Sequence, residues 1–267
     1  MIRDITIGQY YPADSILHRL DPRTKLMGTL IFIISVFLFH TIPGYAVATI
    51  FLAALIKISK VPVKFIFKGL KAIFVILIIT MLFNIFLTPG EVIWKLGFLK
   101  MTKEGISLAV RMAIRLIYLV IGSSLMTLTT TPNQLTDGLE RGLRPLNRLH
   151  VPVHEISMMM SIALRFIPIL LEETDKIMKA QIARGADFEN GNLIQKVKNM
   201  VPLLVPLFIS AFRRANDLAM AMEARCYHGG EQRTQMKPLC YEKRDHAAYL
   251  ILAAYLAVAI TFRVVGI

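Results

Sequence analysis

Long apolar segments constrain this 267-residue chain more than any other feature of its sequence. The clearest runs from Ala72 to Thr88 without a charged residue. A helix needs about 20 largely apolar residues to cross roughly 30 Å of hydrocarbon. With only 18% charged residues, the chain also falls below the roughly 25% of soluble domains. Four other segments have this character: residues 22–39, 45–58, 105–128 and 247–262. We predict an all-α integral membrane protein with about five transmembrane helices.

Loop charges orient these segments in the membrane. Between the first two there is no Lys or Arg, whereas five lysines separate the second from the third: Lys57, Lys60, Lys64, Lys68 and Lys71. Basic loops stay in the cytoplasm, so we expect a cytoplasmic N-terminus and an external C-terminus. At the start of the first helix, which Asp21 caps, Arg23 and Lys25 are expected to snorkel to the membrane surface.

The chain then divides into three parts. Residues 1–128 form a membrane domain with four transmembrane helices, 129–246 form a cytoplasmic or interfacial coupling-helix domain, and 247–267 form the C-terminal transmembrane helix. Two apolar runs in the middle part, 156–171 and 200–212, contain polar or proline residues and are interpreted as interfacial helices. If both crossed the bilayer, the protein would have seven spans, and many basic residues would lie outside.

Two long helices are expected in the middle part. One runs from Val153 to Arg184 and is stopped by Gly185, and the other runs from about Leu203 to Arg225. Their ends match: Ala183-Arg184-Gly185 and Ala224-Arg225-Cys226. Ala211, Ala215 and Ala219 form a small-residue stripe that would let the helices cross closely. Each helix would present an arginine at its tip, suited either to carboxylates on a partner or to ordinary C-capping.

Several motifs resemble the transmembrane T component of energy-coupling factor (ECF) transporters. They are DPRTKL at 21–26, LRPL at 143–146, VPVHE at 151–155, ALRFIP at 163–168 and ARGADF at 183–188. The resemblance implies a scaffold in a prokaryotic cell membrane that holds two ATP-binding-cassette ATPases and a substrate-binding membrane S component. It would couple ATP hydrolysis on those partners to uptake of a vitamin or similar micronutrient.

The resemblance also assigns the two helix tips. In the family, two Ala-Arg-Gly motifs insert into grooves of the two ATPases, and the matching residues here are Ala183, Arg184, Gly185, Ala224 and Arg225. Cys226 stands where the second motif has glycine, which leaves the geometry of that tip open. The unequal tips suggest that the two ATPases are not identical.

The chain lacks a G-x-x-x-x-G-K-[ST] phosphate loop, so we expect no enzymatic activity and no cofactor of its own; ATP and Mg²⁺ would bind the partner subunits. No metal site is predicted at His150 and His154, because Pro152 separates them. The excess of basic residues, which gives a net charge of +13, is attributed to orientation and to anionic lipids as partners rather than to nucleic acid.

Polar residues inside the predicted spans leave an alternative open. Asn84 is interpreted as an interhelical hydrogen-bonding group. Arg111 and Arg115 either face a protein interior or aqueous path, or snorkel to the external surface. Along such a path, the chain could act as an autonomous permease or channel. The run Met158–Met160 is either core or an adaptable binding surface.

Overall fold

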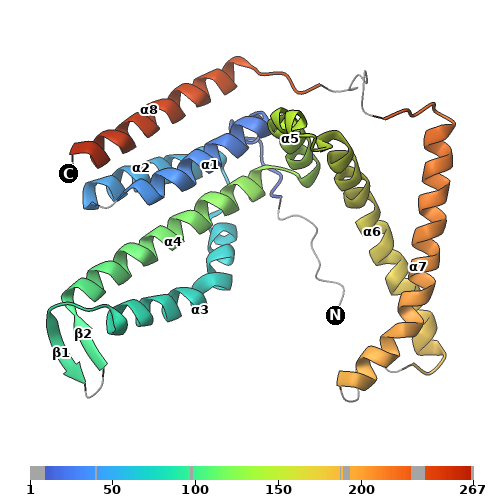
Figure 1. The fold of residues 1–267 in the computed structure, drawn as a ribbon, viewed down its shortest axis with the longest axis horizontal. Coiled ribbons are helices and arrows are strands. Elements are labelled where there is room, and N and C mark those ends of the chain that lie inside the picture. The colour runs from blue at the N-terminus through green and yellow to red at the C-terminus, as the bar shows by residue number, and fades with distance from the viewer. Residues whose placement is uncertain are drawn as a thin grey trace. The chain divides into compact units, whose positions relative to one another are not determined.

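A computed structural model describes residues 10–39, 41–96, 99–186, 188, 193–229 and 238–265 (Figure 1). Its helices are α1 (Pro22–Leu38), α2 (Ile42–Ser59), α3 (Val63–Leu87), α4 (Lys103–Thr129), α5 (Pro132–Leu143), the short 3₁₀ helix η1 (Arg144–Leu149), α6 (Val153–Ala183), α7 (Leu193–Glu223) and α8 (Lys243–Val265). Two short strands, β1 (Val92–Leu96) and β2 (Leu99–Thr102), lie between α3 and α4. The predicted all-α class is confirmed, with this hairpin as a small addition.

The chain forms two compact units. One contains residues 8–141 and 239–267, and here it is called the helical-bundle unit. The other is built on residues 142–238 and is called the hairpin unit, since it holds the pair α6 and α7. The predicted three-part division into membrane and cytoplasmic segments stays a prediction.

In the helical-bundle unit, α4 is the central helix. It packs against α1, α2 and α3, while α1 also packs against α8 (Figure 1). At the junction with α3, a Cβ on Gly105 would lie only 2.8 Å from the Asn84 carbonyl oxygen, so glycine permits the close approach.

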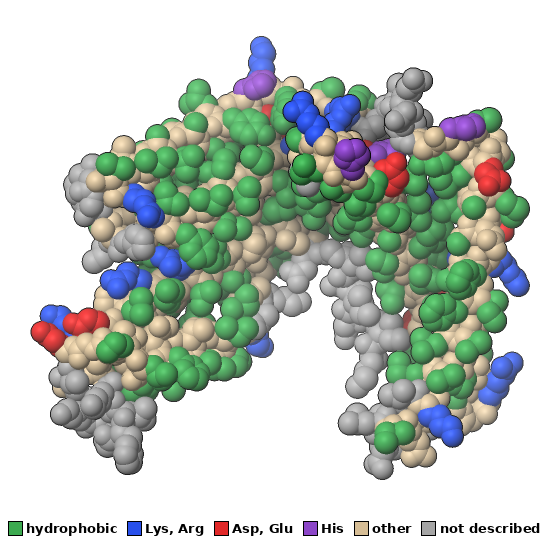
Figure 2. All heavy atoms as spheres, in the orientation of Figure 1, with side chains coloured by type: hydrophobic (Ala, Val, Ile, Leu, Met, Phe, Trp, Pro, Cys, Tyr) green, Lys and Arg blue, Asp and Glu red, His purple; other side chains and the backbone are tan. Residues whose placement is uncertain are grey.

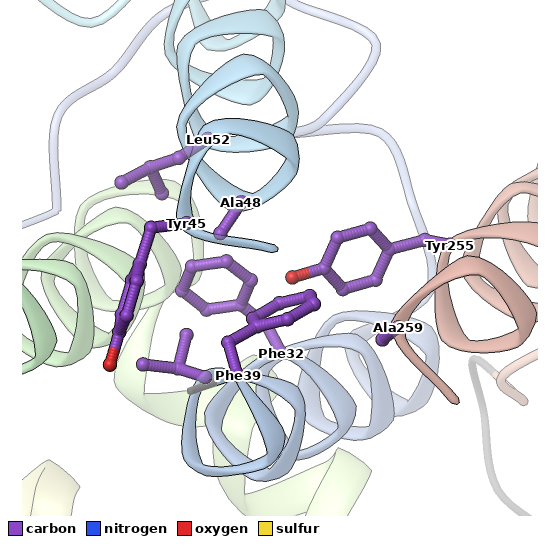
Figure 3. Packing of buried hydrophobic residues seen from close by; sticks show 8 residues of the cluster. Phe32, Phe39, Tyr45, Ala48, Leu52, Tyr255 and Ala259 are labelled. Atoms are coloured by element: carbon purple, nitrogen blue, oxygen red, sulfur yellow. The ribbon is translucent and has the colours of Figure 1, made fainter. Parts of the chain in front are cut away.

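Aromatic side chains fill the centre of this bundle (Figure 3). Tyr255 of α8 points its ring toward Phe32 and Phe39, and its hydroxyl lies 2.8 Å from the hydroxyl of Ser35 on α1. The Tyr255 ring also stacks on Phe51 of α2 at a centroid distance of 4.2 Å. The last helix of the chain is therefore joined to the first two by a buried cluster.

The connection between α3 and α4 is more ordered than the loop that the sequence suggested. β1 and β2 pair antiparallel, and Thr102 Oγ1 donates to the Thr88 carbonyl across the base of the hairpin at 2.8 Å. The Thr102 hydroxyl also caps α4 by accepting from the Gly105 amide at 3.1 Å. The strand pair β1–β2 thus joins the end of α3 to the start of α4.

Helix α3 is bent by 57° between Val63–Lys71 and Ile73–Leu87. The bend falls between the lysine-bearing stretch that ends at Lys71 and the apolar span predicted from Ala72 to Thr88. The apolar part leaves large hydrophobic side chains exposed, and hydrophobic side chains cover much of its visible face in Figure 2. Those with more than half of their surface exposed include Phe74, Val75, Ile76, Leu82, Phe83 and Leu87. Such a face suits lipid contact.

Within the described residues, α4, α6 and α8 are long and apolar enough to cross a membrane, and α3 qualifies as a fourth when its bent parts count as one span. Helix α2 is apolar but shorter. A membrane protein is therefore confirmed. The count of five spans stays a prediction. So does the interfacial position of α6, which is itself long and apolar enough to cross a membrane.

In the hairpin unit, α6 and α7 pack against each other with opposite chain directions (Figure 1). Glu173 of α6 accepts hydrogen bonds from two groups of α7: the Ser210 hydroxyl and, at 2.8 Å, the Arg214 guanidinium. The predicted pair of long packed helices is thus observed. However, Ala215 and Ala219 are exposed, so the alanine stripe is not buried between the two helices.

Helix α7 begins at Leu193, earlier than predicted, and continues through Pro202 and Pro206. Proline has no N–H, so Pro206 cannot donate to the carbonyl four residues before it. That carbonyl, of Pro202, instead accepts from the Gln181 side chain of α6 at 3.4 Å. A contact between helices thus replaces the hydrogen bond that the proline removes.

Candidate docking site

The first predicted tip ends α6 in a defined turn. The amide of Gly185 donates to the Ile182 carbonyl at 2.9 Å, and the amide of Ala186 donates to the Gln181 carbonyl at 3.0 Å. This bond pair, with a left-handed residue after the cap, is the Schellman motif. Gly185 has φ +89°, which explains why glycine occupies this position. The end predicted at Arg184–Gly185 is therefore confirmed.

The second tip repeats this turn at the end of α7. The amide of Cys226 donates to the Glu223 carbonyl at 2.8 Å, and the amide of Tyr227 donates to the Met222 carbonyl at 3.1 Å. Cys226 takes the left-handed position with φ +55°. The sequence had left the geometry of this tip open. With cysteine at this position, the second tip forms the same turn as the first tip forms with glycine.

The two tips present the same groups in the same order. Arg184 and Arg225 both occupy the cap position, directly after the alanines Ala183 and Ala224 and before the left-handed residue, and all six tip residues are exposed. The C-terminal end of the helix dipole favours a positive charge at such a cap position. Each helix end therefore carries an exposed guanidinium on a rigid turn.

Substitution of Cys226 tests whether this residue adopts the left-handed conformation that closes the turn. A β-branched side chain is strongly disfavoured at positive φ, whereas glycine is free to adopt it. We expect Cys226→Val to open the last turn of α7 and to accelerate hydrogen exchange of the Tyr227 amide by about tenfold, or 1.4 kcal/mol. Cys226→Gly is the matched control and should leave that exchange rate within about twofold. Equal exchange rates in the two variants would contradict the assigned geometry.

The DPRTKL motif forms a buried polar cluster at the start of α1 rather than a surface site. Asp21 caps α1 by accepting from the Arg23 amide at 2.9 Å, and the Arg23 guanidinium bonds both carboxylate oxygens of Asp21. Burial alone raises the pKa of the Asp21 carboxyl, but the hydrogen bonds and charge of Arg23 outweigh burial and leave that pKa below its usual value.

Residues near the start of α8 complete this cluster. The Arg23 guanidinium donates to the Leu239 carbonyl and lies 3.9 Å from the centroid of the Tyr241 ring. Asp245, only 2% exposed, accepts from the backbone amides of Asp21 and Glu242, each at 2.9 Å. Asp245 was not predicted from the sequence, although an acidic residue just before an apolar run is a typical sign of a helix start.

Lys25 does not snorkel as predicted. It is 7% exposed, and its ammonium group donates to the carbonyls of His18 at 3.0 Å and Thr129 at 2.9 Å. These carbonyls lie at the end of α4 and in the segment before α1, and they compensate the buried charge better than a distant surface could. The prediction was wrong because the fold supplies acceptors that the sequence does not reveal.

The two arginines of α4, Arg111 and Arg115, differ from each other. Arg111 is exposed and bonds Ser107 of its own helix at 2.8 Å. Arg115 is half-buried and donates to the Phe39 carbonyl and the Tyr45 hydroxyl, each at 3.4 Å. It therefore joins α4 to the turn between α1 and α2, which is a structural position.

The structure also gives the contacts of Asn84 and the exposure of the run Met158–Met160. The Asn84 amide donates to the Thr80 carbonyl of its own helix at 2.8 Å, in place of the interhelical bond that we had expected. Met159 and Met160 of α6 are 58% and 44% exposed. The run is therefore not core of the described chain, which favours its interpretation as a contact surface.

Comparisons of the sequence with a family profile and with individual known proteins agree with each other. A family profile described as cobalt transport protein (CbiQ) matches residues 13–236. A relative from Clostridium kluyveri is 54% identical over 266 residues, covering 99% of this chain and 98% of its own. Relatives from Ruminiclostridium cellulolyticum and Bacillus subtilis are 58% and 47% identical, with at least 92% of each chain covered.

All three relatives bear the name energy-coupling factor transporter transmembrane protein EcfT. The similarity runs through both compact units and includes the two helix tips, so it does not depend on the membrane segments alone. The resemblance inferred from the five motifs is confirmed, and the chain belongs to the EcfT family of transmembrane components of energy-coupling factor transporters.

Proposed function

We propose that this chain holds two non-identical ATPase subunits of the ATP-binding-cassette class at its Arg184 and Arg225 tips. Through a membrane S component, it would couple ATP hydrolysis by those subunits to uptake of a vitamin or similar micronutrient. The observation that carries the proposal is the repetition of one exposed, arginine-bearing Schellman turn at the ends of two packed helices. Two equal turns suit two related docking partners.

The packing of α6 on α7 suits a coupling role. The Glu173–Arg214 ion pair and the Gln181–Pro202 hydrogen bond fix one helix against the other. A displacement of one tip would therefore be passed to the other helix and to the exposed methionines of α6. These flexible side chains suit the S component as an adaptable contact surface.

The test is to identify the proteins that copurify with the full chain after mild detergent extraction from its own host membrane. We expect two different nucleotide-binding chains and one small, very hydrophobic chain. A control extraction in high salt should release the nucleotide-binding chains, since charged contacts weaken with ionic strength. Solute flux through the purified chain reconstituted alone would contradict the proposal and support an autonomous permease.

A further inference from the structure

The helical-bundle unit contains a cavity of about 540 Å³ that the proposed function does not use. Helices α1, α2, α4 and α8 and the segment before α1 line it, and it is partly open to the outside. This volume lies within the range of roughly 300–1,000 Å³ typical of small-molecule sites. Most of its wall is apolar, with Phe32, Phe51 and Leu252 among the lining residues.

Polar groups line the cavity at one end. Thr24 and Lys25 come from the start of α1, Thr129 from the end of α4 and Arg244 from the start of α8. Thr24 is 2% exposed, and its hydroxyl has no hydrogen-bond partner among the described residues. Buried hydroxyls are nearly always bonded, so this one is available to a ligand atom at the polar end.

The charges at this end select the kind of ligand. Lys25 and Arg244 are both cationic, and the described lining includes no Asp or Glu. Among the described residues, the one ion pair of Arg244 is a long contact of 3.7 Å with the exposed Glu242 carboxylate. An anionic polar group would thus find two cations and a free hydroxyl, while an apolar tail would fill the remaining wall.

The length of the cavity favours one kind of apolar tail for the ligand. From Lys25 to Phe32 the wall extends about 10 Å along α1, at 1.5 Å per residue. One leaflet of a roughly 30 Å hydrocarbon core is about 15 Å deep. A transmembrane helix of a partner, about 10 Å wide, would instead need a groove along the full depth. The dimensions favour an acyl chain.

We propose that this cavity binds an anionic phospholipid, with an acyl chain between α1, α2, α4 and α8 and the headgroup at Thr24, Lys25 and Arg244. With the predicted cytoplasmic N-terminus, the polar end faces the inner leaflet, where anionic lipids attract basic groups. The bound lipid would complete the packing of α8 on the bundle.

The test measures binding of phosphatidylglycerol and phosphatidylcholine to the purified full chain by native mass spectrometry. We expect phosphatidylglycerol to bind about fivefold more tightly than phosphatidylcholine. Ala248→Leu, which fills the cavity wall, should weaken phosphatidylglycerol binding by about tenfold, because the acyl chain loses its place. Ala254→Leu, on the same helix but exposed and outside the cavity, is the matched control and should bind as the parent does.

A second variant tests the polar end without filling the cavity. Thr24→Val removes the hydroxyl and should reduce the preference for phosphatidylglycerol about threefold, while thermal stability in lipid-free detergent stays unchanged. Equal binding of the two lipids, or undiminished binding by Ala248→Leu, would overturn the proposal. Crosslinking of a partner polypeptide to the cavity in native membranes would overturn it as well. The outcome of the lipid-binding test does not depend on whether the two tips dock ATPases.

Discussion

The double variant Arg184→Ala, Arg225→Ala is expected to abolish ATP-driven uptake while the chain still inserts into the membrane. Truncation of an arginine that anchors an interface costs about 2 kcal/mol or more, which is roughly a 30-fold loss of affinity at each tip. Both arginines are exposed on the surface of their own chain, so their removal leaves the packing of α6 and α7 intact. Uptake by cells and copurification of the ATPases are the measurements.

Arg213→Ala provides the matched control for this loss. Arg213 is an exposed arginine in the middle of α7, away from either tip. Its removal lowers the net charge of the same helix and should leave uptake within about twofold. Full uptake by the double variant, or an equal loss in Arg213→Ala, would contradict docking at the tips.

The second large effect is expected at Asp245. Asp245→Ala leaves the buried backbone amide of Asp21 and the partly buried amide of Glu242 without their acceptor. An unsatisfied buried donor costs about 1–3 kcal/mol, so we expect a loss of about 3 kcal/mol for the pair. For a chain of this size, that corresponds to a decrease in Tm of roughly 6–12 °C. Thermal unfolding of the detergent-solubilised full chain is the measurement.

Glu242→Ala is the control for Asp245. The Glu242 carboxylate is 63% exposed, and its contact with Arg244 is long. Exposed ion pairs contribute about 0–1 kcal/mol, so the Tm should change by no more than about 4 °C. A similar decrease in both variants would show that the polar cluster at α1 does not hold α8.

The long helices and their ends could be predicted because their signals are local. Asp21-Pro22 marks the start of α1, and Gly185 marks the end of α6. Each residue acts on the few backbone groups beside it, so the sequence alone contains the information. The placement of Arg184 at the cap position of α6 follows from the second of these ends.

The remaining features depend on contacts between distant segments. Lys25 is buried because carbonyls from the segment before α1 and from α4 surround it. The carbonyl of α7 that Pro206 leaves without its helical donor is bonded by Gln181 of another helix. Local propensities cannot predict such features, because tertiary contacts override them.

The most direct measurement of the central claim is labelling of Cys226 with a membrane-impermeant maleimide. Cys226 is exposed and directly follows Arg225, and Cys240→Ser leaves it as the only cysteine. If the tips lie in the cytoplasm and dock ATPases, Cys226 will be unlabelled in sealed cells. In inverted vesicles it will react only after the ATPases have been stripped off. Labelling in sealed cells, or labelling that the ATPases do not change, would contradict the account.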